Sequence, residues 1–283
     1  MFKGFKAIAR GESHKEKDLP CQDAVFFKPY RNGGIIAVAD GHGSEKHFRS
    51  DSGSEFAVNI AHSTIYEFNT ILRNEMKGKG KNHAAAARFS AASAKEEQMK
   101  QVERTIISRW RAEVIKHYRD HPLSDGEREL CARLNLDSDQ ENTQVRFYGT
   151  TLLAALLKDS FWFVIQIGDG KCVIIDGRKK ASFLPALDNE ALGFGKTTSL
   201  CDSNAVENFR HVYGDTPIKG ITLATDGVSD SFLPDAYLEF HERFYADFRA
   251  DPNRASEGVE KGIGVWAAAG SRDDAAMAGI LRV

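Results

Sequence analysis

The hydrophobic positions of this chain fall into short continuous runs, and an aspartate follows several of them. The clearest run, Ile35–Ala39, is apolar throughout and is followed at once by Asp40, Gly41 and His42. A run of this length that ends in turn residues is typical of a strand buried on both faces. The same arrangement, an apolar strand with an aspartate at its end, returns three times further along the chain. A carboxylate, a glycine and an imidazole at the mouth of a rigid strand are well placed to hold a hard metal ion.

The N-terminal region predicts a hairpin. Asn32-Gly33 stands between two apolar runs, which is the strongest short-range hairpin signal, so we expect Ala24–Lys28 to pair antiparallel with Ile36–Asp40. This pairing brings Asp23 close to Asp40 at the open end of the hairpin. Two neighbouring carboxylates repel unless a cation lies between them. The alternative is that both are ordinary solvated acids at strand ends.

Helical patterns occupy the region that follows. Ser44 is a suitable N-cap for a helix that reaches about Asn69 or beyond, and residues 84–117 predict a second, longer helix because they are rich in Ala, Glu and Arg. Lys77–Lys81 predicts a basic turn, which is either a phosphate-binding loop or, more commonly for such a charge run, a solvated connection. His121–Thr143 is polar and predicts a loop with a short helical piece.

The second half of the chain predicts more strands. These strands are Gly149–Leu157, Phe161–Ile167, Lys171–Ile175, Ile221–Ala224 and Ala275–Val283. A further strand, Phe5–Ala9, is expected at the start of the chain. Gly168-Asp169-Gly170 predicts a further hairpin, in which Asp169 is either a site residue or simply a turn residue. Residues 181–220 lack long apolar runs and predict an irregular flap. Helices are expected over Asp235–Phe248 and Arg254–Ala268, and the aromatic stripe of the first is interpreted as core packing.

Composition sets limits on the function. The chain has 283 residues and a formal net charge of −2, and its 42% hydrophobic and 28% charged residues are ordinary for a globular protein. We therefore predict one domain over residues 1–283, a cytoplasmic monomer, with neither nucleic acid nor membrane as a partner. No apolar run approaches the ~20 residues of a membrane span. Four scattered cysteines without a CxxC pair indicate reduced thiols and argue against a zinc site.

The acids at the strand ends are Asp23, Asp40, Asp169, Asp226, Asp230 and Asp273. No histidine pair at metal-ligand spacing accompanies them, so an all-oxygen site for magnesium or manganese is expected. Two such ions about 4 Å apart can share a water and lower its pKa, so that hydroxide can attack phosphorus without a serine or cysteine nucleophile. His42 could then protonate the departing oxygen as general acid. The alternative is that His42 only lies beside a helix cap and takes no part in the chemistry.

Five motifs in this order, AVADGHGS, GTTLL, IGDGK, LATDGVSD and SRDD, resemble the metal-dependent protein phosphatases of the protein phosphatase 2C family. The resemblance runs from about Gly11 to the C-terminus, and the opening SHKEKDLPCQDA is similar to the compact prokaryotic branch. It implies an α+β fold, a four-layer αββα sandwich of two antiparallel β-sheets flanked by helices. It also implies hydrolysis of phosphoserine and phosphothreonine in proteins, with a cognate kinase or its targets as partners.

The resemblance also assigns residues. Asp40 resembles the aspartate that bridges two metals, and Gly41 resembles the glycine whose carbonyl ligates one of them. Asp23 matches the acid of the opening motif, while Asp226 and Asp273 match the aspartates of the two later strand motifs. Asp169 and Asp230, together with Asp226, resemble the ligands of a third, weaker ion. His42 stands where the family has its general acid.

Four features depart from the family pattern. An arginine that clamps the substrate phosphate in the best-known branch is replaced by Asp18; Arg10, His14, Lys15 or Lys17 could substitute, and we favour His14 as the phosphate-binding residue. The family's GDSR reads Gly168-Asp169-Gly170-Lys171, and Asp274 takes a position usually held by asparagine. The segment between Asp169 and Asp226 is short, which implies a small flap.

Two other functions compete with a phosphatase. One is a non-catalytic signalling module of the same fold, although such a module has no physical reason to keep mutually repelling acids. The other is a structural protein stabilised by calcium, which would leave His42 without a role.

Overall fold

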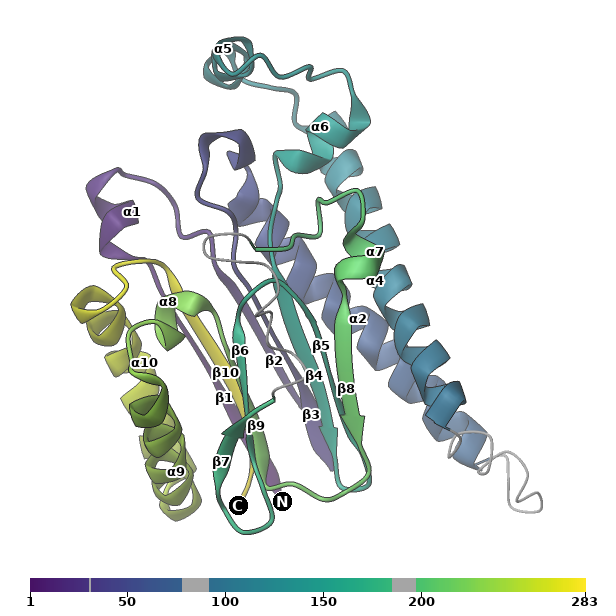
Figure 1. Cartoon of the computed structure of the whole chain (residues 1–283), viewed down its shortest axis with the longest axis vertical. Coiled ribbons are helices and arrows are strands. Elements are labelled where there is room, and N and C mark those ends of the chain that lie inside the picture. Colours follow the sequence, from purple (N-terminus) through teal and green to yellow (C-terminus); the bar gives the residue numbers. More distant parts are fainter. Residues whose placement is uncertain (31, 78–91, 185–196) are drawn as a thin grey trace.

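The strands of the protein form two five-stranded sheets. The computed structural model describes residues 1–30, 32–77, 92–184 and 197–283. One sheet has the strand order β1-β10-β9-β6-β7 and the other β2-β3-β4-β5-β8, and all neighbouring pairs are antiparallel. The sheets stack between two layers of helices (Figure 1). The predicted four-layer αββα sandwich is therefore confirmed.

The first sheet consists of β1 (Phe2–Ala9), β10 (Ala275–Arg282), β9 (Gly220–Ala224), β6 (Lys171–Ile175) and β7 (Ala181–Phe183). The second consists of β2 (Ala24–Tyr30), β3 (Gly33–Ala39), β4 (Leu152–Lys158), β5 (Trp162–Ile167) and β8 (Arg210–Gly214). The longer helices are α2 (Ser50–Lys77), α4 (Ala92–Asp120), α9 (Pro234–Ala250) and α10 (Pro252–Ala269). The shorter ones are α1 (Glu12–Glu16), the 3₁₀ turn η1 (Glu45–His47), α5 (Asp125–Arg133), α6 (Glu141–Arg146), α7 (Ala205–Asn208) and α8 (Asp226–Ser229).

Strand β3 shows why the apolar runs are continuous. Ile36 and Val38 lie in the core between the two sheets, whereas Ile35 and Ala37 lie in the core shared with α2 and α4. Both faces of the strand are therefore covered, and polar residues have no face to occupy. Burying each of the larger side chains contributes roughly 1.5–3 kcal/mol, which makes β3 a rigid support for the residues that follow it.

Helices α9 and α10 cover the outer face of the other sheet (Figure 1). The aromatic stripe of α9 faces inward: Tyr237, Phe244 and Phe248 are buried, and Phe240 is partly buried against the same cluster. The interpretation of this stripe as core packing is confirmed.

The first hairpin forms as expected, with longer strands. Ala24 pairs with Ala39 and Tyr30 with Gly33, so the register places Asp23 opposite Asp40 just beyond the last pair. The same register continues one step further, because the Gly41 amide donates to the Gln22 carbonyl at 3.1 Å. The two acids thus sit at the open end of the hairpin.

The second predicted hairpin is wrong. Strands β5 and β6 belong to different sheets, so the chain crosses from one layer to the other at Gly168–Gly170. Gly168 adopts a φ of +104° at this crossing, a conformation that side chains disfavour. The Asp-Gly signal therefore marked a real change of direction, but the partner of each strand is decided by contacts elsewhere in the sheets.

Two helical predictions also need correction. Ser44 begins only the 3₁₀ turn η1, its side chain makes no capping hydrogen bond, and the long helix starts at Ser50. The polar stretch 121–143 contains α5 and the start of α6 rather than one short piece. Ser124 and Glu127 cap α5 reciprocally.

Part of the predicted flap consists of regular elements, since β7, α7 and β8 fall within residues 181–220. Residues 185–196 of the flap and most of the basic turn, residues 78–81, lie outside the described residues. In the part of the chain that the structure describes, no helix is long and apolar enough to cross a membrane.

Candidate metal centre

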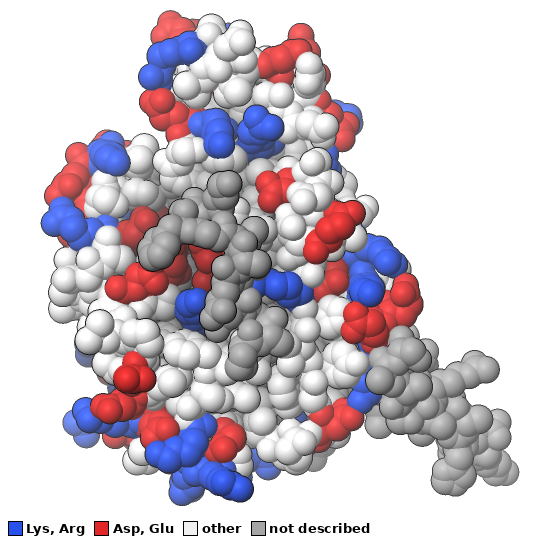
Figure 2. Space-filling view, viewed as in Figure 1, with Lys and Arg blue, Asp and Glu red and all other residues white. Residues whose placement is uncertain are grey.

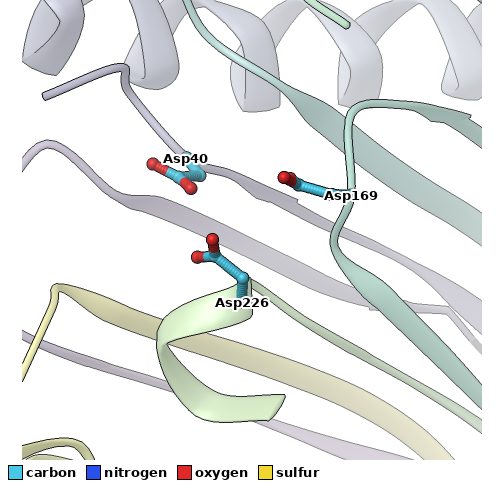
Figure 3. Close-up of side chains that lie close together, drawn as sticks. All are labelled: Asp40, Asp169 and Asp226. Carbon is cyan, nitrogen blue, oxygen red and sulfur yellow. The ribbon is translucent and has the colours of Figure 1, made fainter. Parts of the chain in front are cut away.

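Acidic side chains from both sheets meet at one end of the sandwich. Asp40 follows β3, Asp169 lies in the crossing between β5 and β6, and Asp226 opens α8 directly after β9. Each offers a carboxylate oxygen, and these oxygens all lie within 4.8 Å of one another. Figure 3 shows the three side chains pointing toward a common point. The three residues are far apart in the sequence, and the feature they share is a position at the end of a strand.

The backbone around Asp40 is fixed by the start of β4. The Asp40 amide donates to the Thr151 hydroxyl at 2.9 Å, and the Asp40 carbonyl accepts from the Thr151 amide at 2.8 Å and the Thr150 hydroxyl at 2.9 Å. A Cβ at Gly41 would lie 2.6 Å from the Gln22 carbonyl oxygen and 2.7 Å from that of Ser50. Only glycine fits between these segments, so the Asp-Gly step is required by packing at the site itself.

The remaining predicted ligands surround this group at different depths. Asp23 is buried, accepts a hydrogen bond from the Thr225 hydroxyl at 2.7 Å and does not line the cavity. Asp273 lines the cavity with a side chain that is 57% exposed. Asp230 is exposed and outside the lining, yet it is close enough to Asp226 to raise the pKa of that acid.

A cavity of about 1060 Å³ opens over the acids. Figure 2 shows acidic side chains near the middle of this face. The acidic lining residues are Asp40, Asp169, Asp202, Asp226, Asp273 and Asp274. The basic ones are His14, His42, Lys46, His47 and Arg146. Acid and base are thus both available to one bound molecule.

The buried acids are mutually unfavourable without a cation. Burial, followed by the charges of neighbouring aspartates, raises the pKa values of Asp23 and Asp40 well above their ordinary range. Burial and the charge of Asp169 raise the pKa of Asp226 to about 6. None of the three has an ion pair with a described residue. Divalent cations of the magnesium type bind such carboxylate oxygens, so the donor set fits a hard metal ion.

His42 lies beside the acids with its ring against His47, the ring centroids being 4.8 Å apart. Its backbone amide donates to the Gly149 carbonyl at 3.0 Å. Burial, and then the charge of Lys46, lowers the pKa of His42 to about 4. The imidazole is therefore neutral at pH 7 unless a bound anion restores its proton.

Four residues were proposed to replace the missing arginine, and of these only His14 is among the described residues that line the cavity. Its Nδ1 lies 2.7 Å from Asp274 Oδ2. Asp274 in turn accepts from the amides of Gly11 at 2.7 Å and Gln22 at 2.6 Å. Asp274 therefore connects three segments around His14, a role that the sequence did not reveal.

Sequence comparison identifies the family. A family model described as protein phosphatase 2C matches residues 10–261, and the chain belongs to this family. The resemblance drawn from the five motifs is confirmed. A search of curated proteins by sequence found no significant match.

Solved structures share the fold along their whole length. A serine/threonine phosphatase of S. agalactiae is 15% identical with a TM-score of 0.57, and each chain covers 100% of the other. PppA, a regulatory component of the type VI secretion system of Pseudomonas aeruginosa, is 12% identical with a TM-score of 0.57, covering 100% of this chain and 98% of its own. The catalytic domain of the serine/threonine phosphatase PstP, in complex with two manganese ions, is 13% identical with a TM-score of 0.55, covering 99% and 97%.

Sequence reasoning missed several residues of the cavity wall. Lys46 and Arg146 have no local chemical signal, since neither belongs to a motif that points to the site. Thr150 and Thr151, which hold the Asp40 backbone and do not line the cavity, were noticed only as part of a motif. Their hydroxyls open an otherwise apolar strand, and this placement is a usable signal for a backbone-holding role.

Proposed function

We propose that this protein is a metal-dependent serine/threonine protein phosphatase, a phosphoric monoester hydrolase. The observation that carries the proposal is the convergence of the Asp40, Asp169 and Asp226 carboxylates within 4.8 Å at a large cavity, in a chain of the protein phosphatase 2C family. The substrate is a phosphorylated protein segment, and a cognate kinase or its targets are the expected partners.

The cofactors would be two Mg²⁺ or Mn²⁺ ions, with a third, weaker ion. Asp40, Gly41, Asp23, Asp226 and Asp273 are the proposed holders of the pair, and Asp169 and Asp230 join Asp226 for the third ion. When bound, such a pair supplies positive charge for the phosphate oxygens and a water of lowered pKa. Relief of the repulsion among the buried acids supports this assignment, because their raised pKa values require a cation for full ionisation at pH 7.

Two histidines handle the substrate in this proposal. His14, whose Nδ1 lies 2.7 Å from Asp274 Oδ2, binds the phosphate where the family's arginine is missing. His42 protonates the leaving serine or threonine oxygen. Its lowered pKa means that it must gain a proton as the substrate binds, and a phosphate dianion beside the ring favours this.

The decisive experiment is hydrolysis of p-nitrophenyl phosphate and of phosphoserine and phosphothreonine peptides after chelation, with and without added manganese. We expect turnover only with the metal, and almost none from Asp40→Asn. No metal-dependent turnover above the Asp40→Asn background would overturn the proposal and leave the non-catalytic signalling module as the better interpretation. Calcium protection against melting without such turnover would favour the structural protein.

A further inference from the structure

The cavity has a cationic wall that the reaction itself does not use. Lys46, on η1, and Arg146, at the end of α6, both line the cavity and both are exposed. Neither forms an ion pair with a described residue. Arg133, in contrast, is paired with Glu45, the neighbour of Lys46, at 2.7 Å. Two cations without acidic partners therefore face one opening.

The position of Lys46 and Arg146 relative to His42 and His47 indicates on which side of the metal centre this wall lies. Lys46 directly precedes His47 in the chain, and the His47 Nδ1 lies 2.5 Å from the Arg146 carbonyl oxygen. The His47 ring in turn packs against His42, with the ring centroids 4.8 Å apart. If His42 protonates the leaving oxygen, the polypeptide that carries this oxygen leaves the metal centre on this side. Residues flanking the phosphorylated one would then pass over Lys46 and Arg146.

The rest of this wall is polar with little opposing charge. Asn142, Ser203, Asn204 and Asn208 line it. Among the described lining residues, the acids outside the proposed metal ligands are Asp202, whose Oδ2 accepts from the Ser199 amide at 2.8 Å, and Asp274, which lies against His14. The cavity of about 1060 Å³ also exceeds what one phosphorylated side chain fills. The wall thus offers positive charge and hydrogen bonds to a second part of the substrate.

Resting on the proposed phosphatase function, we infer that this cationic wall selects phosphorylated segments carrying further negative charge beside the phosphorylated residue. Either carboxylates or a second phosphate would supply that charge, because both are oxyanions that pair with Lys and Arg. Such exposed pairs are individually weak and sensitive to salt. They would therefore change the choice among substrates rather than the chemical step.

The test compares kcat/KM on three phosphopeptides that differ only in the flanking residues: neutral, acidic, and doubly phosphorylated. We expect the double variant Lys46→Gln/Arg146→Gln to lower the acidic-to-neutral ratio about three- to tenfold at low salt. A larger fall for the doubly phosphorylated peptide would identify a second phosphate as the preferred source of charge. The acidic-to-neutral ratio of the wild type should approach that of the variant as the salt concentration increases.

A matched control has the same change in net charge away from the cavity. Lys6→Gln/Arg254→Gln removes two exposed cations that do not line it, so the ratio should stay at the wild-type value. An unchanged ratio in Lys46→Gln/Arg146→Gln, with wild-type turnover of all three peptides, would overturn the inference and leave the phosphatase proposal intact. Absence of turnover on every peptide and on p-nitrophenyl phosphate would instead reject the phosphatase proposal itself.

Discussion

The protein has buried and half-buried carboxylates in two kinds of surroundings. At the candidate metal centre, Asp23, Asp40 and Asp226 face other acids and have no ion pair with a described residue. Near the helical layer, in contrast, Glu103 meets His211 at 2.8 Å and Glu127 meets Arg49 at 2.7 Å. Every acid in the second group therefore has its cation within the chain, whereas the first group needs one from outside.

The electrostatic consequences are opposite. At the metal centre, burial and acidic neighbours raise the pKa of Asp226 to about 6. At the helical layer, burial works against the charge of Glu127, but the hydrogen bonds from Arg49 and Ser124 and the charge of Arg49 together outweigh burial and lower the pKa of that acid. Burial likewise lowers the pKa of His211, and its bonds to Glu103 and Glu96 more than reverse this. Burial alone thus does not mark a functional acid; burial among like charges does.

The strongest test of this contrast is to neutralise one acid from each of the two groups. Asp226→Asn should lower phosphatase turnover by several orders of magnitude, because it removes a proposed direct metal ligand. Glu103→Gln should leave turnover within a few-fold and instead lower stability by about 1–3 kcal/mol, since a buried hydrogen-bond partner is weakened. Steady-state kinetics with manganese and urea unfolding measure the two effects. Near-normal rates in Asp226→Asn would mean that the metal site lies elsewhere.

The next effect tests the internally paired region. Arg49→Met leaves Glu127 without its cation, and it also removes donors to the Tyr148 hydroxyl and the His121 carbonyl. We expect a loss of about 3–5 kcal/mol in the free energy of unfolding. The double variant Arg49→Met/Glu127→Gln should recover part of this loss, because no unpaired charge remains. A loss below about 1 kcal/mol in the single variant would place the pair with ordinary surface ion pairs.

The third effect concerns the imidazole beside the acids. His42→Ala should lower the rate roughly 10²-fold on a substrate with a poor leaving group, such as a phosphoserine peptide, and less on p-nitrophenyl phosphate. A general acid matters most when the leaving oxygen is basic. Because the pKa of His42 is lowered, its contribution should grow as pH falls. Equal losses on both substrates would remove the proton-donor role from His42.

How much of this was visible in the sequence depends on whether each signal is local. Asp40 follows its apolar run directly and Asp226 follows its run after Thr225, so their placement at strand ends could be predicted. Asp169 could be predicted even though its hairpin was wrong, because an acid between two strands reaches a strand end whether the chain turns back or crosses over. The capping box of α5, Ser124 to Glu127, was readable but overlooked.

Long-range partners could not be predicted. Nothing near Gly168 says that β6 will pair with β9 rather than with β5. The contact of His14 with Asp274 joins the two ends of the chain and depends on β1 pairing with β10. Arg146 lines the cavity because of where α6 lies after α5, and the sequence between these helices does not give that position. These features follow from packing across the whole sandwich.

The smallest effect concerns the stability of the metal-free protein. The pKa of Asp226 is about 6 in the folded chain, against an ordinary value of 3.8. The stabilising contribution of its proton is therefore complete below about pH 4 and is lost as pH rises through about 6. We expect the chelated wild-type protein to lose about 1–3 kcal/mol over this window from Asp226. The loss should be smaller in Asp226→Asn, which cannot ionise there.

Added manganese should reverse the trend, because it replaces the missing proton with a stronger cation. The metal-induced rise in melting temperature should accordingly grow between pH 4 and pH 7 in the wild type and be largely lost in Asp226→Asn. The chelated variant should also melt above the chelated wild type at pH 7, although it is the less active protein. If it melted lower, the acids would be stabilising one another through hydrogen bonds, and the contrast with the internally paired acids Glu103 and Glu127 would fail.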